Sequence, residues 1–245
     1  MLKIENTEVL GWDAAIRGMR NPLNSWEKSD SQFVRDPDYG CFGVCPCAEL
    51  VDCDCCHVGP NDLKLMNTLR NAGTDHRKFM RMITGYLDIT APLYWWKEFD
   101  TYKVGTVANS CSTMHKIADK EFTLEDFSHE HLLSMANNDA GDALFLNDAN
   151  NIRVDGDDLL GLIINVLNYY RGRYIKTKDK RYWWQLIQLL PSSYNQKRTV
   201  MLNYEVLANI YKSRRHHKLD EWHTLCDRIE SLPYSKLITG GVVDE

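Results

Sequence analysis

The stretch APLYWWKEFDTYKVGTVANSCSTMH, residues 91–115, decides how this chain is expected to fold. Its first part predicts a helix, because Leu93, Trp96 and Phe99 recur at helical spacing behind a capping threonine and an early proline. After Lys103 the residues are small or carry hydroxyl and amide groups, so they have little to bury and predict a loop. Such a loop forms ordinary turns, or it presents its donors to a phosphate or a flavin ring.

The composition is typical of a soluble globular protein. Its 245 residues suffice for one large domain or two small ones, and 44% of them are hydrophobic. The net charge of −5 argues against a general nucleic-acid binder, which is usually basic. We also expect no membrane partner and a cytoplasmic location, because the chain has neither a long apolar run nor the pattern of a secretory signal.

Apolar periodicity predicts most of the remaining elements. They are a helix over 13–20, a helix over 61–72 capped by Asn61, a strand over 82–90, a helix beginning after Thr123, a long helix from 157 to 174, and a last helix lined by Trp222, Leu225, Cys226 and Ile229. The buried stripe of the long helix is expected to consist of Leu160, Ile163, Ile164 and Leu167. Arg17 and Arg20 stand near the end of the first helix, where they are either solvated or held by a partner.

A cysteine-rich segment interrupts this pattern between residues 35 and 60. Cys41, Cys45, Cys47, Cys53, Cys55, Cys56 and His57 lie within 17 positions. Four thiolate or imidazole ligands complete the tetrahedral shell of zinc, so Cys45, Cys47, Cys53 and Cys56 are candidate ligands of a structural zinc site. A loop of free thiols, or a disulfide formed on isolation, explains the same spacing.

The stretch 91–115 resembles the signature region of flavin-dependent thymidylate synthases, in which a helix opening on Ala-Pro leads into R-H-R-x-x-S. Ala91-Pro92 match the opening, Lys103 falls on the last residue of the triplet, and Thr106 falls on the serine. The other signature positions carry Thr101, Tyr102, Cys111, Thr113 and Met114. The likeness is therefore one of layout, and much of the signature chemistry is replaced.

Two further segments resemble the same family. Gly73 and His76 resemble the start of a glycine–histidine segment that precedes the signature. Towards the C-terminus, Leu190-Pro191 match a Leu-Pro, residues 199–203 match a strand that ends on an Asn, and Arg214 matches an arginine of the next helix. An arginine expected shortly before the Leu-Pro falls near Gln188 and is missing.

The resemblance implies an α+β fold, helix-rich with a central, mostly antiparallel sheet. It implies one domain over residues 1–245, with the cysteine-rich insertion at 35–60 and a polar loop at 134–157. It also implies a homotetramer with sites between subunits.

In function, the resemblance implies a methyltransferase that binds FAD, dUMP and a methylene-folate and methylates C5 of the uracil. Carried over by position, the cofactor contacts are His76, Lys103, Thr106 and Asn109. The substrate contacts are Ser110, Ser112, Arg198 and Arg214. No catalytic residue is assigned, because such an enzyme relies on orientation and charge more than on a nucleophile.

Other classes of function remain open from the sequence. The first is a protein of the same fold that has lost catalysis and instead senses a nucleotide or binds another protein. One ring of each pair, Trp95-Trp96 and Trp183-Trp184, would then be exposed at the interface. The second is a metal-dependent enzyme that uses the cysteine cluster. Weaker candidates for direct chemistry are a Cys111–His115 pair and the acids Asp88, Glu98 and Asp100.

Overall fold

The computed structural model describes residues 2–33, 56–134, 144–147 and 152–240. The chain packs as two compact units. One unit comprises Thr90–Phe99 and Ser110–Lys197 and is called the helical unit below; the other comprises Leu2–Ile89, Asp100–Asn109 and Arg198–Glu245 and is called the sheet unit. The chain passes from one unit to the other four times, three times within a strand and once directly after Phe99, and each unit is described by itself.

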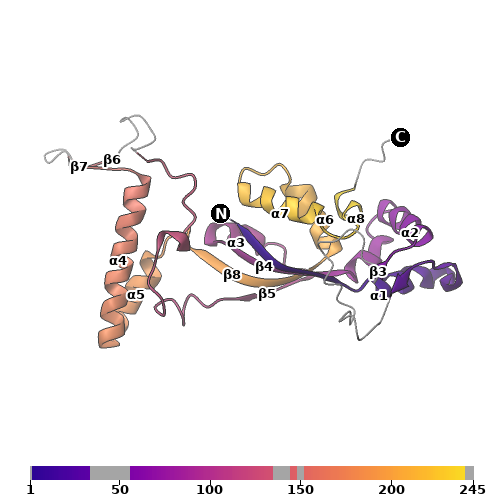
Figure 1. Ribbon diagram of the computed structural model, residues 1–245, viewed down its shortest axis with the longest axis horizontal. Helices are drawn as coiled ribbons and strands as arrows, with labels where there is room; N and C mark the ends of the chain where they lie inside the picture. Colours follow the sequence, from indigo (N-terminus) through magenta and orange to yellow (C-terminus); the bar gives the residue numbers. More distant parts are fainter. Residues whose placement is uncertain (1, 34–55, 135–143, 148–151, 241–245) are drawn as a thin grey trace. The chain divides into compact units, whose positions relative to one another are not determined.

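A four-stranded sheet, counted over the described residues, forms the main part of the sheet unit (Figure 1). Its strands are β1 (Lys3–Leu10), β4 (Thr84–Pro92), β8 (Asn195–Asn203) and β5 (Thr106–Ser110), in the order β1-β4-β8-β5. Leu87 and Ile89 of β4 and Val200 and Leu202 of β8 are buried, since alternate side chains point to one face. The helix-rich fold class with a central antiparallel sheet is confirmed.

Helices of the sheet unit supply the rest of its core. They are α1 (Trp12–Arg20), η1 (Asn21–Leu23), η2 (Trp26–Lys28), α2 (Pro60–Asn71), η4 (Arg77–Arg81), α6 (Tyr204–Arg214), α7 (Asp220–Glu230) and α8 (Lys236–Thr239). The ring of Trp12 meets Tyr204 and Tyr234 edge-on, at centroid distances of 5.3 and 5.0 Å. Two short strands, β2 (Gln32–Phe33) and β3 (Cys56–His57), pair antiparallel.

The helical unit contains α3 (Leu93–Phe99), η5 (Leu124–Asp126), a hairpin of β6 (Leu144–Asn147) and β7 (Ile152–Val154), and the helices α4 (Gly156–Thr177) and α5 (Lys180–Leu189). Its core brings together Ile117, Phe122, Phe127, Leu160, Leu167 and Leu186. The predicted stripe of α4 therefore packs as expected, with Ile163 and Ile164 against the same cluster. None of the described helices is long and apolar enough to cross a membrane.

The signature stretch differs from its prediction at both ends. Strand β4 continues through Pro92, so the helix begins at Leu93. The first N–H groups of α3 are satisfied by remote carbonyls, because Leu93 donates to Tyr194 and Tyr94 to Ser192. Within the predicted loop, residues 106–110 form strand β5, since the sheet offers their backbone hydrogen bonds that composition cannot reveal.

Three smaller predictions are also corrected. Asn61 does not cap α2; the carboxylate of Asp30 accepts hydrogen bonds from the N–H groups of Asn61 and Asp62 at 2.8 and 3.1 Å. Trp95 and Trp96 are both fully buried, so neither ring of that pair is exposed. Part of the polar loop predicted at 134–157 is the β6–β7 hairpin and the start of α4.

Candidate functional site

Two arginines predicted to bind substrate reach the segment that follows α3. Arg198, on β8, donates from Nη1 to the carboxylate of Asp100 at 2.7 Å. Arg214, at the end of α6, donates from Nε to the hydroxyl of Tyr102 at 3.0 Å. Both contacts lie within the sheet unit, and Asp100 and Tyr102 shortly precede Lys103 in the sequence. Positive charge from three distant parts of the sequence therefore gathers at residues 100–103.

Aromatic rings fix the orientation of Arg214. Its guanidinium carbon lies 4.7 Å from the ring centroid of Trp222 and 5.7 Å from that of Tyr102. A guanidinium over an aromatic face is attracted by the quadrupole of the ring, and its planar fork is then held in one direction. Glu205, in the first turn of the same helix, binds Arg77 and Arg81.

The turn between α3 and β5 approaches the start of α6 very closely. Gly105 has φ +77°, and a Cβ at this position would lie 2.6 Å from Nδ2 of Asn203. The side-chain oxygen of Asn203 in turn caps α6 by accepting from the N–H of Val206 at 3.0 Å. A residue with a side chain at 105 would therefore disturb the helix that carries Arg214.

Strand β5 carries several exposed polar side chains and one buried hydroxyl, that of Thr106. It is an edge strand, and its residues from Val107 to Ser110 are exposed. The hydroxyl of Thr106 is buried and has no hydrogen-bond partner among the described residues. An unsatisfied buried hydroxyl costs about 1–3 kcal/mol, so a ligand that supplies its partner would recover that cost. Lys103 and Asn109, the neighbouring cofactor candidates, are exposed.

Two further arginines, Arg77 and Arg81, follow His76 in the chain. Arg77 and Arg81, on η4, share the carboxylate of Glu205, the first of them at 3.1 Å. Burial alone would raise the pKa of Glu205, but the hydrogen bonds from the two arginines outweigh it and lower this pKa below its ordinary value. Asp75 also attracts Arg81, so two carboxylates face these two cations next to the exposed His76. The sequence pointed to His76 but not to Arg77.

Ser110 and Ser112, the other predicted substrate contacts, belong to the helical unit. Ser110 is exposed at the end of β5. The hydroxyl of Ser112 accepts hydrogen bonds from the N–H groups of Met114 and His115 at 3.2 and 3.0 Å, which is the bonding of a serine that forms a turn. Cys111 is an exposed free thiol.

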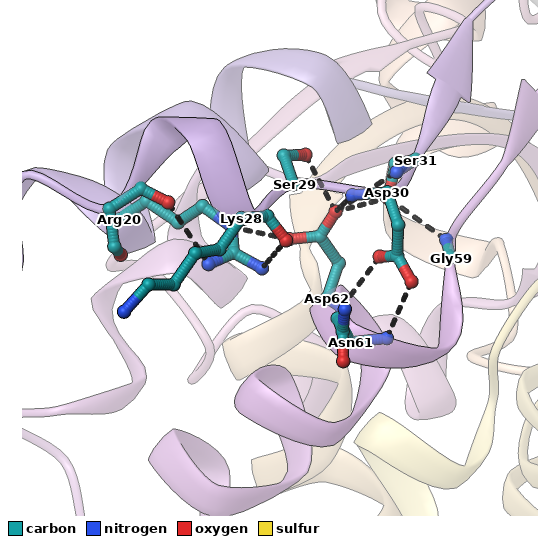
Figure 2. A network of polar contacts seen from close by, with 9 residues as sticks. Arg20, Lys28, Ser29, Asp30, Ser31, Gly59, Asn61 and Asp62 are labelled. Atoms are coloured by element: carbon teal, nitrogen blue, oxygen red, sulfur yellow. Dashed lines mark hydrogen bonds and ion pairs between the residues drawn. The ribbon is translucent and has the colours of Figure 1, made fainter.

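A buried ion pair between Arg20 and Asp62 connects α1 to α2 in the sheet unit (Figure 2). Asp62 is fully buried and accepts from Nε of Arg20 at 2.6 Å and from the hydroxyls of Ser29 and Ser31 at 2.7 and 2.6 Å. Burial would raise the pKa of Asp62, but the serine and arginine hydrogen bonds lower it below its usual range. Arg20 is therefore a structural residue that ties α1 to α2, and it is not solvated.

The remaining chemical candidates are engaged or lie elsewhere. Asp88 accepts from Asn6 and from the hydroxyl of Thr199 at 2.9 and 2.6 Å, and Asp100 is held by Arg198. Cys45, Cys47 and Cys53 lie outside the described residues, as does the side chain of Cys56. Among the residues that the structure describes, no group of three or more His, Cys, Asp or Glu could hold a metal ion.

The fold that carries these residues is that of flavin-dependent thymidylate synthases. Among solved structures, the chain resembles thymidylate synthase X (ThyX) from Helicobacter pylori with FAD and dUMP, at 16% identity over 98% of each chain and a TM-score of 0.62. It also resembles a UMP/dUMP methylase, PolB, from Streptomyces cacaoi bound with 5-Br UMP, at 12% identity over 94% of this chain and 88% of that one, with a TM-score of 0.53. No protein-family model and no curated protein matches the sequence.

Sequence reasoning missed the residues that hold the predicted arginines. From the sequence, Tyr102 is a replaced signature position, Trp222 lines an apolar helix face and Asp100 is a weaker candidate for direct chemistry. The pairs Tyr102–Arg214 and Asp100–Arg198 join positions that are 112 and 98 residues apart. Helical and strand periodicity report on neighbours along the chain, so they carry no signal of such contacts.

Proposed function

We propose that this chain binds FAD and a pyrimidine nucleotide, dUMP, and acts on the uracil ring. The observation that carries the proposal is the convergence of Arg198 and Arg214 on residues 100–102, next to Lys103. A phosphorylated ligand needs such fixed cations, because charge-assisted hydrogen bonds to phosphate are the strong ones. The fold supports the same conclusion, since the H. pylori protein of this fold was solved with FAD and dUMP.

The donor set of the sheet unit fits a phosphate-bearing cofactor. Lys103 would supply a cation, Thr106 its orphan hydroxyl and Asn109 an exposed amide. His76, next to Arg77 in the chain, would add a ring nitrogen. A bound flavin would supply the hydride that completes a methyl group. The protein residues would hold its phosphates and ribityl chain in place.

Arg214 would bind the phosphate or the pyrimidine of the nucleotide, and Arg198 would add charge from β8. The reaction would be C5 methylation of the uracil with a methylene-folate as carbon donor, in a homo-oligomer. Orientation and fixed positive charge would then account for the catalysis.

Cofactor binding is tested on the purified full chain by visible absorbance and by titration of FAD fluorescence. We expect bound flavin, and a loss of FAD affinity of about tenfold or more in Lys103→Ala, since one charge-assisted bond disappears. Lys97→Ala is the matched control, because Lys97 is an exposed lysine of α3 in the other unit, and it should bind FAD like the unchanged chain. A colourless protein that ignores added FAD would overturn the proposal.

The half-exposed Trp184 favours a second candidate, a fold that has lost its chemistry and binds another protein. Its ring is 44% exposed on α5, whereas Trp95 and Trp96 are buried. Exposed tryptophan is enriched where proteins meet. Turnover of dUMP with FAD and a methylene-folate separates the two candidates, because a binding module would show none while still capturing its partner.

A further inference from the structure

Basic and aromatic side chains gather around the turn that joins α4 to α5 in the helical unit (Figure 1). Residues 169–185, YYRGRYIKTKDKRYWWQ, contain six Lys or Arg and one Asp, whereas the whole chain contains 29 basic and 34 acidic residues. The same stretch holds six Tyr or Trp. It therefore has a net charge of +5 within a chain whose net charge is −5, and it is called the basic hairpin below.

The charges and rings of the basic hairpin are accessible to a ligand. Five of its six basic residues are exposed, namely Arg173, Lys176, Lys178, Lys180 and Arg181. The sixth, Arg171, donates to the backbone carbonyls of Ala118 and Asp119 at 2.9 and 3.2 Å and so serves the packing of the unit. Tyr169 and Trp184 are 61% and 44% exposed. The surface therefore offers both positive charge and aromatic rings.

Cations and rings alternate across the basic hairpin from α5 to α4. The ammonium of Lys180 lies 5.7 Å from a ring centroid of Trp184. Arg173, on α4, donates from Nη2 to the hydroxyl of Tyr182 at 2.9 Å, and its guanidinium carbon lies 5.1 Å from the centroid of that ring. The ring of Tyr182 in turn stacks on Tyr170 at a centroid distance of 6.3 Å. The two helices thus share one band of positive and aromatic groups.

An open hollow of about 450 Å³ adjoins this band on α5, and it is lined by Arg181, Trp184, Gln185 and Gln188. Its volume is within the range of small-ligand pockets. The indole supplies a face on which a planar ring stacks, and each amide can both donate to and accept from the edge of such a ring. The guanidinium beside them suits a phosphate. The hollow therefore has the groups that one nucleotide of a longer strand requires.

Helix stability does not explain the charges at the start of α5. Lys180 and Arg181 occupy its first turn, where the helix dipole disfavours a cation. Asp179, the N-cap, offsets part of this charge by accepting from Nη2 of Arg181 at 2.7 Å. Lys180 remains exposed. An anionic ligand bound here would relieve the unfavourable charge, which is a reason to look for such a ligand.

We propose that the basic hairpin binds single-stranded nucleic acid, with its cations on the phosphates and with Trp184 and Tyr169 stacked on bases. Such ligands combine a regular anionic backbone with exposed planar rings, and proteins hold them with positive surfaces that carry aromatic side chains. The net charge of the whole chain argues against general nucleic-acid binding, but exposed charges are screened beyond about 10 Å at 0.1 M salt, so the local surplus decides.

Other polyanions would meet the same charge. The amides of Gln185 and Gln188 beside Trp184 favour bases over an anionic membrane, because base edges bond to amides and lipid tails do not. The basic hairpin lies in the helical unit, whereas Lys103, Arg198 and Arg214 lie in the sheet unit. The proposal therefore does not depend on the flavin and dUMP proposal, and either can fail alone.

The test is fluorescence anisotropy of a labelled single-stranded oligonucleotide of about 15 nucleotides, titrated with the full chain at several salt concentrations. We expect saturable binding whose association constant falls as salt rises. Lys176→Ala and Lys180→Ala should each weaken binding and lower the slope against the logarithm of the salt concentration by about 0.7, since one phosphate contact is lost. Lys64→Ala is the matched control, because Lys64 is an exposed lysine of α2 in the sheet unit, and it should change neither quantity.

Trp184→Ala tests stacking separately from charge. The affinity should fall about tenfold, because one base loses its aromatic platform, while the salt slope should stay the same. Trp26→Ala is the control, because Trp26 is 50% exposed in the sheet unit, and it should bind like the unchanged chain. The lysine variants keep the test decisive if Trp184→Ala fails to fold, since they change only exposed side chains.

Competition then identifies the class of ligand. Saturating FAD and dUMP should leave the oligonucleotide bound, and polyglutamate, heparin and vesicles of anionic lipid should compete poorly. Displacement by dUMP would mean that the oligonucleotide enters the proposed nucleotide site, and this would overturn the inference. Equal affinity for polyglutamate or heparin, tighter binding to the vesicles, no binding of the oligonucleotide, or equal losses in Trp184→Ala and Trp26→Ala would overturn it as well.

Discussion

The guanidinium of Arg214 donates a hydrogen bond to the hydroxyl of Tyr102 at 3.0 Å while it lies over the ring of Trp222. The three residues come from the end of α6, the turn after α3 and the first turn of α7. A long side chain held in this way has lost its rotamer freedom before any ligand arrives. Ligand binding then avoids that entropic cost, which is about 0.5–1.5 kcal/mol for a side chain of this kind.

Tyr102→Phe should weaken dUMP binding about fivefold and leave the free energy of unfolding within about 0.5 kcal/mol. The reason is that one hydrogen bond, worth about 1 kcal/mol, no longer orients Arg214, while the ring contact stays. Calorimetric titration with dUMP measures the effect. Tyr182→Phe is the control, because the hydroxyl of Tyr182 also accepts from an arginine, Arg173, but lies on exposed α5. Equal losses in both variants would contradict a specific role for Tyr102.

Gly105→Ala should destabilise the fold by about 1–3 kcal/mol. The residue has a positive φ, and its new methyl group would press on the amide of Asn203, which caps α6. Urea unfolding measures the change. Gly172→Ala has no heavy atom within 4 Å of its Cβ and sits inside helix α4, so it should instead stabilise by roughly 0.5–1 kcal/mol. Opposite signs for the two variants are the expected pattern, and a neutral Gly105→Ala would refute the close approach.

Thr106→Val should separate stability from binding. The substitution replaces an unpartnered buried hydroxyl by a methyl group of similar shape, so the free energy of unfolding should stay equal or rise by about 1 kcal/mol. FAD affinity should fall at the same time, because the ligand loses a hydrogen-bonding group. Thermal unfolding and FAD titration of one preparation test both parts. If stability drops instead, the hydroxyl already has a partner and is not reserved for a ligand.

Asp62→Asn should cost about 3–5 kcal/mol of folding free energy, because it leaves the buried Arg20 without its counter-charge. The pKa of Asp62 is lowered in the fold, so its stabilising effect is complete above the unfolded pKa of about 3.9 and is lost as the pH falls through the folded value. The variant should therefore lose less stability than the unchanged chain below about pH 4. Asp119→Asn, in an exposed pair with Lys116, should cost less than about 0.5 kcal/mol.

The fold was predictable from the sequence where local pattern and packing agree. The stripe of α4 and the buried face of α7 follow from helical spacing, because one face of each helix meets a single core. The start of α3 was misplaced because Pro92 is tolerated at the end of a strand as well as in a first helical turn. Strand β5 was missed because its hydrogen bonds come from β8, far away in the sequence.

The candidate site was predictable in part. Lys103, Arg198 and Arg214 were predicted as ligand contacts, because their positions along the chain follow the order of elements in the family that the sequence resembles. The partners Asp100 and Tyr102 were not predicted in these roles, because a side-chain contact across about a hundred residues depends on how β8 and α6 pack. The cap of α2 shows the same limit, since Asp30 acts from outside the helix.

The most direct test of the central claim is calorimetric titration of the full chain with dUMP in the presence of FAD, compared with the same titration using deoxyuridine. The account predicts saturable binding of dUMP, and binding of deoxyuridine weaker by about 100-fold, because the charge-assisted bonds to phosphate are lost. It also predicts that Arg214→Ala abolishes this preference. Equal affinity for both compounds, or no binding of dUMP by a folded chain, would contradict it.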